Sequence, residues 1–526
     1  MAAAGQRLAV LMLLGALLPA LALRVGAVLG ADFPLNDGGL FYAMTEDLRG
    51  AGFTLPWYTS YNAERIPYAY PPLGFYLAGA LAALGPWSLV EVFRWLPLAL
   101  NLLTVGAFYL FARAWLGATL AALLATLAFA LQPRSFLWLI MGGGVTRGLG
   151  LLLAVLTLWQ VYELYRRPRP RPLIFAMLCA AGVVLSHLEM AAFTAVSVVV
   201  LALFYGRHRA GLGATAMLAV GTMALSAPWW GGLLARHGPG VFLAAIGSGS
   251  EPDSWLFLLT LMWVPERWFS LIGALAVVGL LVCLATRQYF LPAWLTALYI
   301  LTPRGVPNRA TLPVALLFVA SLAVVLPLLA RGAASGPLGD WRQRFADPAV
   351  AWALGRRGVR LALLFFVLHA TILGAVSARP ALGALDAADR AALEWVQAHV
   401  PADSAVLVVP AEPFWGLDRL SEWLPALTGR RSVATVQGSE WLPDDEFARR
   451  RNASEALYRC AAQDAACLER WVADTGRAFT HVYVPKRASG VSSGPYAVGL
   501  RATLARDPRY ALLYDGPGAS IYERLP

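Results

Sequence analysis

The chain has 526 residues, of which 59% are hydrophobic and only 14% are charged, and its formal net charge is +11. This composition excludes an ordinary soluble protein and indicates an α-helical polytopic membrane protein. The basic residues are almost all arginines in loops. They form no arginine-rich face with interleaved aromatic residues, so no nucleic-acid partner is expected.

Apolar stretches long enough for membrane helices recur along the first three quarters of the chain, and they predict about eleven spanning helices. They are residues 7–29, 92–112, 117–132, 148–165, 173–186, 189–205, 211–229, 268–285, 289–302, 310–330 and 359–378. A further apolar run, 71–85, is short and contains Pro71 and Pro72. We expect it to lie at the membrane surface rather than to cross the bilayer.

The placement of arginines predicts the orientation of these helices. Cytoplasmic loops carry the excess of basic residues, and the densest basic segment is 166–171. If this segment is cytoplasmic, strict alternation places the N-terminus inside and the C-terminus outside, provided that 71–85 does not span. A multi-pass plasma-membrane protein is therefore expected. The segments predicted to share the outer face are 30–91, 133–147, 230–267 and 303–309.

The composition changes near residue 380, which predicts two domains. Residues 1–378 form the transmembrane module, in which 30–91 is a first outer loop with juxtamembrane helices. Residues 379–526 form a small extracytoplasmic α/β domain. Helices are expected at 386–399, 453–474 and 498–506, strands at 404–410 and 480–485, and a hairpin around Asp515 and Gly516. Cys460 and Cys467 lie in this domain, and the sequence allows either a disulfide between them or two free thiols.

Asp37 is the first candidate for chemistry, because it lies just beyond the first helix and precedes Gly38 and Gly39. A carboxylate beside backbone that bends closely around a substrate suits a general base or a cation ligand. The alternative is an N-cap for a short helix that follows. The same loop carries three further acids, which either bind substrate or face solvent: Glu46, Asp47 and Glu64.

Candidate anion-binding groups follow in the other outer segments. Three glycines, 142–144, and Arg147 open a membrane helix, where free N–H groups and the helix dipole attract phosphate. The glycines alternatively serve close helix packing. Arg304 and Arg309 provide guanidinium forks for a phosphate, unless they only anchor the chain at the interface.

His187 and Glu189 lie at the outer turn of a helix hairpin. They either line a substrate site or form a polar cap, since ionisable groups near the membrane are functional candidates. The histidines and cysteines are scattered without the spacing of a metal site.

The layout resembles that of the GT-C glycosyltransferases, which use polyprenyl-phosphate sugars and include protein O-mannosyltransferases and aminoarabinose transferases. The matching residues are Asp37 after the first helix and the Tyr70-Pro71-Pro72-Leu73 motif that closes the outer loop. The resemblance in layout covers roughly residues 1–330. It implies that Asp37 is the catalytic or metal-coordinating residue and that Tyr70 belongs to the site. It also implies that a polyprenyl-phosphate sugar and a glycan, lipid or protein acceptor meet at the lipid bilayer.

The sequence departs from the metal-dependent members of this class at one point. Those members carry a second acidic motif in the outer loop after the third helix, and here that loop ends at Arg147 without an acid. No metal or other cofactor is therefore expected, and Arg147 is expected to compensate the phosphate charge. Segments 422–430 and 438–441 also resemble proteins of this class, without an assigned role. Two alternatives remain open, a lipid or solute transporter and a non-catalytic membrane scaffold.

Overall fold

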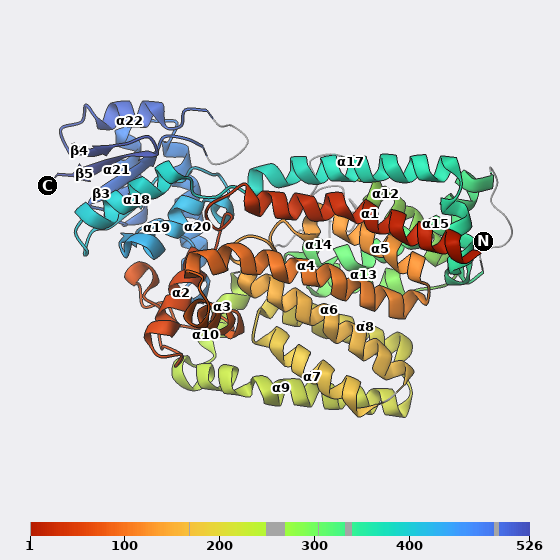
Figure 1. Cartoon of the computed structure of the whole chain (residues 1–526). Coiled ribbons are helices and arrows are strands. Elements are labelled where there is room, and N and C mark those ends of the chain that lie inside the picture. Colours follow the sequence, from red (N-terminus) through yellow and green to blue (C-terminus); the bar gives the residue numbers. More distant parts are fainter. Residues whose placement is uncertain are drawn as a thin grey trace.

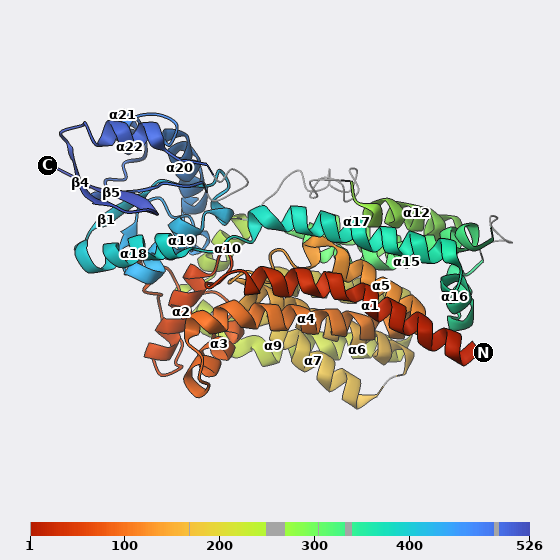
Figure 2. The same cartoon turned by 45° about the horizontal axis from the view of Figure 1, so that its top comes forward.

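A computed structural model describes residues 2–167, 169–248, 269–302, 304–331, 339–488 and 494–525. Figure 1 shows a bundle of long helices with a smaller domain of helices and strands at one end. The N-terminus lies at the opposite end of the bundle, and the second view agrees (Figure 2). The fold is thus the predicted helical bundle followed by a small C-terminal α/β domain.

All eleven stretches expected to span the membrane are helical. They are α1 (Ala2–Leu29), α4 (Leu89–Leu116), α5 (Thr119–Leu131), α6 (Gly144–Arg166), α7 (Pro170–Val184), α8 (Leu188–Tyr205), α9 (Arg209–His237), α12 (Leu271–Ala285), α13 (Phe290–Leu301), α15 (Thr311–Arg331) and α17 (Arg357–Ala381). Among the described residues, seven helices are long and apolar enough to cross a membrane, namely α1, α4, α6, α8, α9, α15 and α17. The other four are shorter, so the count of eleven spans remains a prediction.

The run expected at the membrane surface forms α3 (Leu73–Leu84), a helix of 12 residues that follows Pro72 and ends before Gly85. Twelve helical residues extend about 18 Å, which is less than the roughly 30 Å of a hydrocarbon core. Helix α3 lies beside α2 (Gly39–Gly50) at the end of the bundle next to the C-terminal domain (Figure 1). Its short length and its place agree with a juxtamembrane element.

The loops divide between the two ends of the bundle in the predicted way. The arginine-rich link between α6 and α7 lies at the end that carries the N-terminus, whereas α2, α3 and α10 (Gly240–Gly247) lie at the other end (Figure 1). The outer segment expected at 230–267 falls partly outside the described residues, beyond position 248. Large hydrophobic side chains such as Leu110, Val220 and Phe365 are exposed along the helices, as a bilayer-facing surface requires.

The C-terminal domain contains one five-stranded mixed sheet in the order β2-β1-β3-β5-β4. Its strands are β1 (Ala405–Val408), β2 (Arg431–Ser432), β3 (His481–Pro485), β4 (Tyr510–Asp515) and β5 (Ala519–Arg524), and its helices include α18 (Ala387–His399) and α22 (Val498–Leu504). Along β1, Val406 and Val408 pack into one core and Leu407 into another. Burial of both faces explains the continuous apolar sequence of this strand.

The predicted helix over 453–474 is instead two helices, α20 (Glu446–Cys460) and α21 (Ala465–Thr475). The chain breaks because Asp464 caps α21, its side chain accepting a hydrogen bond from the Cys467 N–H at 3.1 Å. Cys460 and Cys467 form a disulfide across this break. The open question about these two cysteines is thereby answered for the folded chain.

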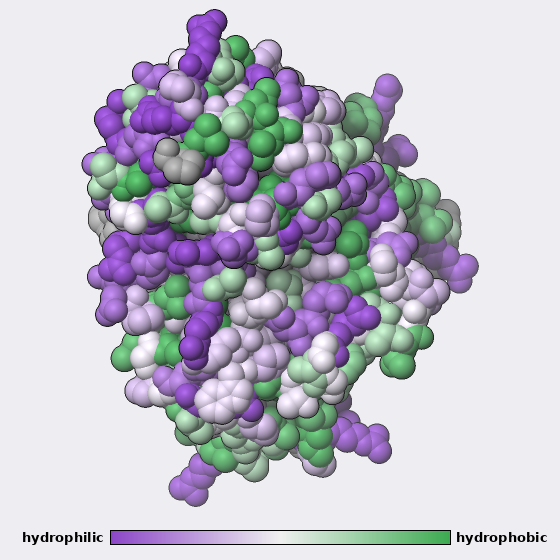
Figure 3. Space-filling view, turned by 90° about the vertical axis from the view of Figure 1, so that its left-hand side faces the viewer, coloured by the Kyte–Doolittle hydropathy of each residue, from purple (hydrophilic) through white to green (hydrophobic). Residues whose placement is uncertain are grey.

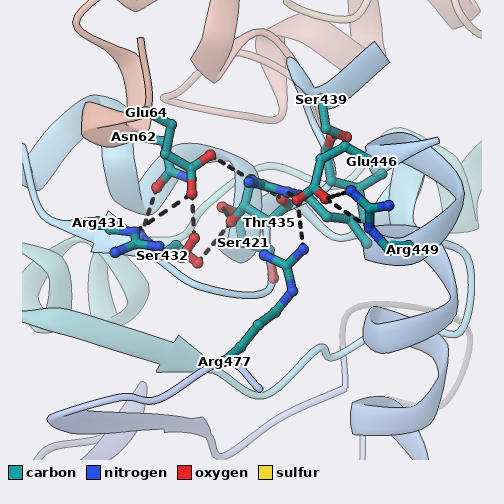
Figure 4. Close-up of polar contacts among 12 residues, drawn as sticks. Asn62, Glu64, Ser421, Arg431, Ser432, Thr435, Ser439, Glu446, Arg449 and Arg477 are labelled. Carbon is teal, nitrogen blue, oxygen red and sulfur yellow. Dashed lines mark hydrogen bonds and ion pairs between the residues drawn. The ribbon is translucent and has the colours of Figure 1, made fainter. Parts of the chain in front are cut away.

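The first loop and the C-terminal domain are joined by a polar network, shown in Figure 4. The Asn62 amide pairs with the Ser432 backbone in both directions, at 3.0 and 2.6 Å. Glu64 forms ion pairs with Arg450 at 2.5 Å and with Arg431 at 3.5 Å.

Seen from this end of the molecule, hydrophilic and hydrophobic side chains are mixed, with many hydrophilic ones over the upper half (Figure 3).

Candidate functional site

A cavity of about 530 Å³ lies between the first loop, the ends of several bundle helices and the C-terminal domain. Seven of the residues singled out from the sequence line it: Asp37, Tyr70, Arg147, His187, Glu189, Arg304 and Arg309. These residues are far apart in the chain and meet because their helices end on the same side. The C-terminal domain completes the wall with six further residues that matter below: Phe414, Trp415, Glu422, Gln437, Glu440 and Trp441.

Asp37 lies in a tight turn between α1 and α2, flanked by Asn36 and Gly38, both with positive φ, 48° and 118°. One oxygen, Oδ1, accepts the Gly143 N–H at 2.8 Å, and the other, Oδ2, accepts from the Arg147 guanidinium at 2.5 Å. Asp37 is not the N-cap of α2, because Gly38 takes that position without a side-chain cap. The carboxylate is instead held against the first turn of α6.

The glycines before α6 allow this contact. A Cβ atom on Gly142 would lie 2.1 Å from the Asp37 carbonyl oxygen, and one on Gly143 would lie 2.8 Å from Asp37 Oδ2. Neither distance leaves room for a methyl group. The sequence predicts that the free N–H and the positive end of this helix bind phosphate. In the structure they bind the carboxylate of Asp37 instead.

Arg147 is fixed on two sides. Its Nε donates to the Trp138 carbonyl oxygen at 3.1 Å, and its guanidinium lies 5.6 Å from the centre of the Trp138 ring. With Asp37 bound at Nη2, the guanidinium is oriented before any ligand arrives. This orientation lowers the entropy cost of contacting an anion in the cavity.

A second ionic cluster lies at the start of α8. Glu189 Oε1 pairs with Arg304 Nε at 2.7 Å, and Glu189 Oε2 pairs with Arg309 Nη1 at 3.1 Å. Gly305, with a φ of 62°, precedes α14 (Val306–Arg309), and this turn brings both arginines to one carboxylate. Apart from Glu422 and Glu440 of the C-terminal domain, the cavity wall thus carries three arginines against Asp37 and Glu189, and this part of the wall favours an anionic ligand.

His187 is the N-cap residue of α8, two positions before Glu189. Its Nδ1 atom is buried and has no hydrogen-bond partner within the part of the chain that the structure describes. The structure therefore brings His187 to the cavity and leaves a polar atom there for a ligand or a water molecule.

Three of the predicted acids do not reach the cavity. Glu46 pairs with Arg49 on the outer surface of α2. Asp47 accepts hydrogen bonds from Thr59 and the Ser60 N–H, at 2.6 and 2.8 Å, and so shapes the first loop. Glu64 belongs to the network with the C-terminal domain. All four acids lie in the same loop, so the sequence did not distinguish these three structural positions from that of Asp37.

Glu422 was not predicted as a site residue, although it contacts the Asp37 turn directly. It lies on α19 (Arg419–Thr428), and its Oε1 accepts the Gly38 N–H at 2.9 Å and the Leu40 N–H at 3.4 Å. Burial, with a further contribution from the Asp37 carboxylate, raises the pKa of Glu422 to about 8. The sequence signs of this position are an acid followed by the apolar run 423–427 and the resemblance of segment 422–430, to which no role was assigned.

Glu440 is the second acid that the sequence did not place. It lies on the short 3-10 helix Ser439–Trp441 and accepts a hydrogen bond from the Tyr70 hydroxyl. Burial raises its pKa to about 7. Tyr70 packs edge-on against Phe41 and Trp441, with ring centres 4.8 and 4.9 Å apart. The predicted aromatic end of the first loop therefore contacts the C-terminal domain as well as the cavity.

The raised pKa of Glu422 predicts how stability depends on pH. An unfolded glutamate titrates near 4.5, so at intermediate pH the folded protein holds a proton that the unfolded chain releases. The stability contributed by this proton is complete at acidic pH and is lost as the pH rises through about 8. We expect the Tm of the purified protein to fall between about pH 6 and about pH 9.

Glu422→Gln keeps the oxygen that accepts from Gly38 and cannot ionise. We expect its Tm to fall less with rising pH than that of the unaltered protein. The slope should not vanish, because Glu440 titrates in the same direction. Thermal denaturation in detergent at several pH values measures this difference, and parallel curves for the two proteins would contradict the assignment.

No protein-family model matches the sequence, and no curated protein matches it. Solved structures do match. ArnT from Cupriavidus metallidurans bound to undecaprenyl phosphate is 15% identical, with a TM-score of 0.51 over 98% of this chain and 97% of that one. The same protein in the apo state gives a TM-score of 0.52. Arabinofuranosyltransferase AftD from Mycobacteria, as its R1389S mutant, is 21% identical with a TM-score of 0.55. That match covers 98% of this chain and 41% of AftD.

The chain has the GT-C fold. Because all these identities are low, the likeness concerns the fold, and the chemistry has to be argued from the site. Nearly the whole of ArnT is covered, so the GT-C likeness includes the C-terminal domain as well as the helical bundle. In this GT-C fold, the cavity described above lies where the two parts meet.

Proposed function

We propose that the protein is a glycosyltransferase that moves a sugar from a polyprenyl-phosphate donor to an acceptor hydroxyl on the outer face of the plasma membrane. The observation that carries this proposal is the arrangement of Asp37. It is held by Gly143 and Arg147 in the wall of a cavity that also carries Arg304 and Arg309. The structure of ArnT bound to undecaprenyl phosphate supports the choice of a lipid-phosphate donor.

The donor phosphate would lie near the three arginines. Arg304 keeps 39% of its side chain exposed while it pairs with Glu189, so it remains accessible to an anion. Leu188 and Ala192 of α8, with Ala245 and Ile246 of α10, form an apolar part of the same cavity wall. This part suits the first units of a polyprenyl chain, because its methyl and methylene groups gain by leaving water.

In the transfer step, Asp37 would take the proton of the acceptor hydroxyl. The acceptor oxygen then bonds to the anomeric carbon, and the bond from that carbon to the phosphate oxygen breaks. The electron pair leaves with the polyprenyl phosphate, and the arginines stabilise its growing negative charge. The proton on Asp37 returns to solvent after the product departs.

We propose that the reaction requires no divalent cation. Both Asp37 oxygens already accept hydrogen bonds from protein donors, and Glu422 accepts two N–H groups beside them. Within the described ranges, no group of three or more His, Cys, Asp or Glu side chains is arranged to hold a metal ion. Arg147 supplies positive charge directly beside Asp37.

The two alternatives have less support. A transporter predicts ionisable residues and broken helices near the middle of the membrane, whereas the acids and arginines of the cavity lie at helix ends beside the C-terminal domain. A non-catalytic scaffold gives no reason to hold a carboxylate and three arginines in the wall of one cavity.

We propose that the C-terminal domain is extracytoplasmic, and the Cys460–Cys467 disulfide supports this location. Leu84, at the end of α3, is 89% exposed and lies on the side of the bundle that carries this domain. A Leu84→Cys variant should react with a membrane-impermeant maleimide in right-side-out vesicles. Arg207→Cys, at the opposite end, should react only after permeabilisation. The native free cysteines 179 and 283 are buried, and the reverse labelling pattern would contradict the orientation.

The function itself is tested with the purified protein in proteoliposomes. A panel of radiolabelled polyprenyl-phosphate sugars, with hexose and pentose head groups, is added together with membrane extract as the acceptor source. We expect release of polyprenyl phosphate and transfer of label with at least one donor. Failure of every donor, with a protein that remains folded by thermal denaturation, would contradict the proposal.

A further inference from the structure

One wall of the cavity comes entirely from the C-terminal domain. Phe414 and Trp415 lie next to each other with ring centres 5.8 Å apart, and Gln437, Glu440 and Trp441 come from a later turn. Gly438 in this turn has a φ of 88°, and a Cβ atom there would lie 2.7 Å from Ile66 of the first loop. The turn is thus pressed against the first loop, which fixes this C-terminal wall in place.

Two buried polar atoms in the C-terminal wall have no partner among the described residues, Glu440 Oε2 and Trp441 Nε1. The residues themselves are 9% and 3% exposed. An unpaired polar atom in such a place costs about 1–3 kcal/mol, so a ligand that pairs with both is favoured. Trp441 offers a donor, and Glu440 offers a carboxyl oxygen. A hydroxyl group can serve either atom, since it both donates and accepts.

The C-terminal wall also differs in charge from the rest of the cavity. None of its five residues is basic, whereas three arginines line the rest of the cavity. Burial raises the pKa of Glu440 to about 7, so this carboxyl group is only partly ionised near neutral pH. Phe414 keeps 49% of its surface exposed beside Trp415. Aromatic faces with a few polar groups suit a neutral ligand that has both C–H surfaces and hydroxyl groups.

We propose that the C-terminal wall binds the acceptor and that this acceptor is a carbohydrate. One of its hydroxyl groups pairs with Glu440 and Trp441, its ring faces pack on Trp415 and Phe414, and a further hydroxyl is directed toward Asp37. This inference rests on the proposed function, in which the arginines hold the donor phosphate in the same cavity. It assigns to residues 414–441 the choice of acceptor.

The test measures acceptor binding without donor, using the full-length protein in lipid nanodiscs and isothermal titration calorimetry. The probes are neutral oligosaccharides of mannose, glucose, galactose and arabinose, and a peptide rich in serine and threonine. We expect saturable binding of at least one oligosaccharide and none of the peptide. Binding of the peptide alone, or of no oligosaccharide, would overturn the proposal.

Variants locate the binding. Trp441→Phe removes the N–H and keeps most of the ring, and we expect affinity for the bound oligosaccharide to fall about tenfold or less, as for one hydrogen bond. Glu440→Leu should weaken binding further, whereas Glu440→Gln, which still accepts from Tyr70, should recover part of the loss. Trp395→Phe serves as the matched control, because Trp395 lies on α18 of the same domain and packs on His399. Unchanged affinity in both Trp441→Phe and Glu440→Leu would overturn the assignment.

The proposed function and this inference fail in different ways. Without glycosyltransferase activity, no donor would release polyprenyl phosphate, whatever the oligosaccharides do. If only the carbohydrate assignment is wrong, donor cleavage persists while oligosaccharide binding is absent or independent of Trp441 and Glu440.

Discussion

Asp37→Asn is expected to lower the rate of sugar transfer by about 100-fold to 10,000-fold, the usual contribution of a positioned general base. The asparagine retains an oxygen for the Gly143 N–H, so the turn before α2 keeps one of its two contacts. It cannot take a proton from the acceptor at neutral pH. Initial rates in proteoliposomes with a saturating donor measure the effect, and we expect the loss to appear in kcat.

Glu46→Gln is the matched control for this experiment. Glu46 lies in the same loop, has 45% of its side chain exposed and pairs with Arg49 at the surface. Its substitution should leave both transfer and the Tm unchanged. Asp37→Asn also loses its ion pair with Arg147 at 2.5 Å, so we expect a lower Tm for that variant, and rates are compared at a temperature at which both variants remain folded. Full activity of Asp37→Asn would remove Asp37 from the mechanism, while equal losses in both variants would indicate a general effect on the loop.

Arg450→Met is expected to cause the largest loss of stability, about 3–5 kcal/mol, as when one partner of a buried ion pair is removed. Arg450 is 5% exposed and pairs with Glu64 of the first loop at 2.5 Å and with Glu446 at 2.7 Å. The variant leaves both carboxylates without this partner at the junction shown in Figure 4. We expect a lower Tm and faster proteolysis of the C-terminal domain.

Arg449→Met separates this junction from an ordinary surface pair. Arg449 also binds Glu446, at 2.8 Å, but its side chain is 59% exposed. Exposed ion pairs contribute about 0–1 kcal/mol, so the Tm should barely change. If Arg449→Met and Arg450→Met destabilise the protein equally, the contact between Arg450 and Glu64 does not hold the two parts together.

Much of the architecture follows from hydrophobic runs and the placement of arginines. Because successive helices cross the membrane in opposite directions, their order in the chain places five site residues on the same side of the membrane. These residues all line the cavity: Asp37, Tyr70, Arg147, Glu189 and Arg309. Predicting the location of the short run at 71–85 required the placement of the arginines as well as hydropathy, because its composition alone resembles that of a spanning helix. These patterns arise because every spanning segment meets the same bilayer. The number and direction of the helices can therefore be predicted from a single sequence.

The contacts within the site were not predictable in the same way. The start of α6 attracts any anion, and the sequence does not say whether a phosphate or the Asp37 carboxylate occupies it. The approach of Glu422 to Gly38 joins residues separated by 384 positions. Such a contact depends on how the C-terminal domain docks, and docking is decided by shape across many residues. The ion pair of Glu64 with Arg450 depends on the same docking.

The turn that carries Asp37 is held from behind by the C-terminal domain. Asn36 receives a hydrogen bond from the Trp423 indole at 2.8 Å and donates its own N–H to the Gly383 carbonyl at 2.7 Å. A chimera that joins this bundle to the C-terminal domain of another protein of this fold would keep the turn only if that domain supplies the same two partners. Exchange of the C-terminal domain between two proteins of this fold has to preserve the Trp423 indole and a backbone carbonyl at the position of Gly383.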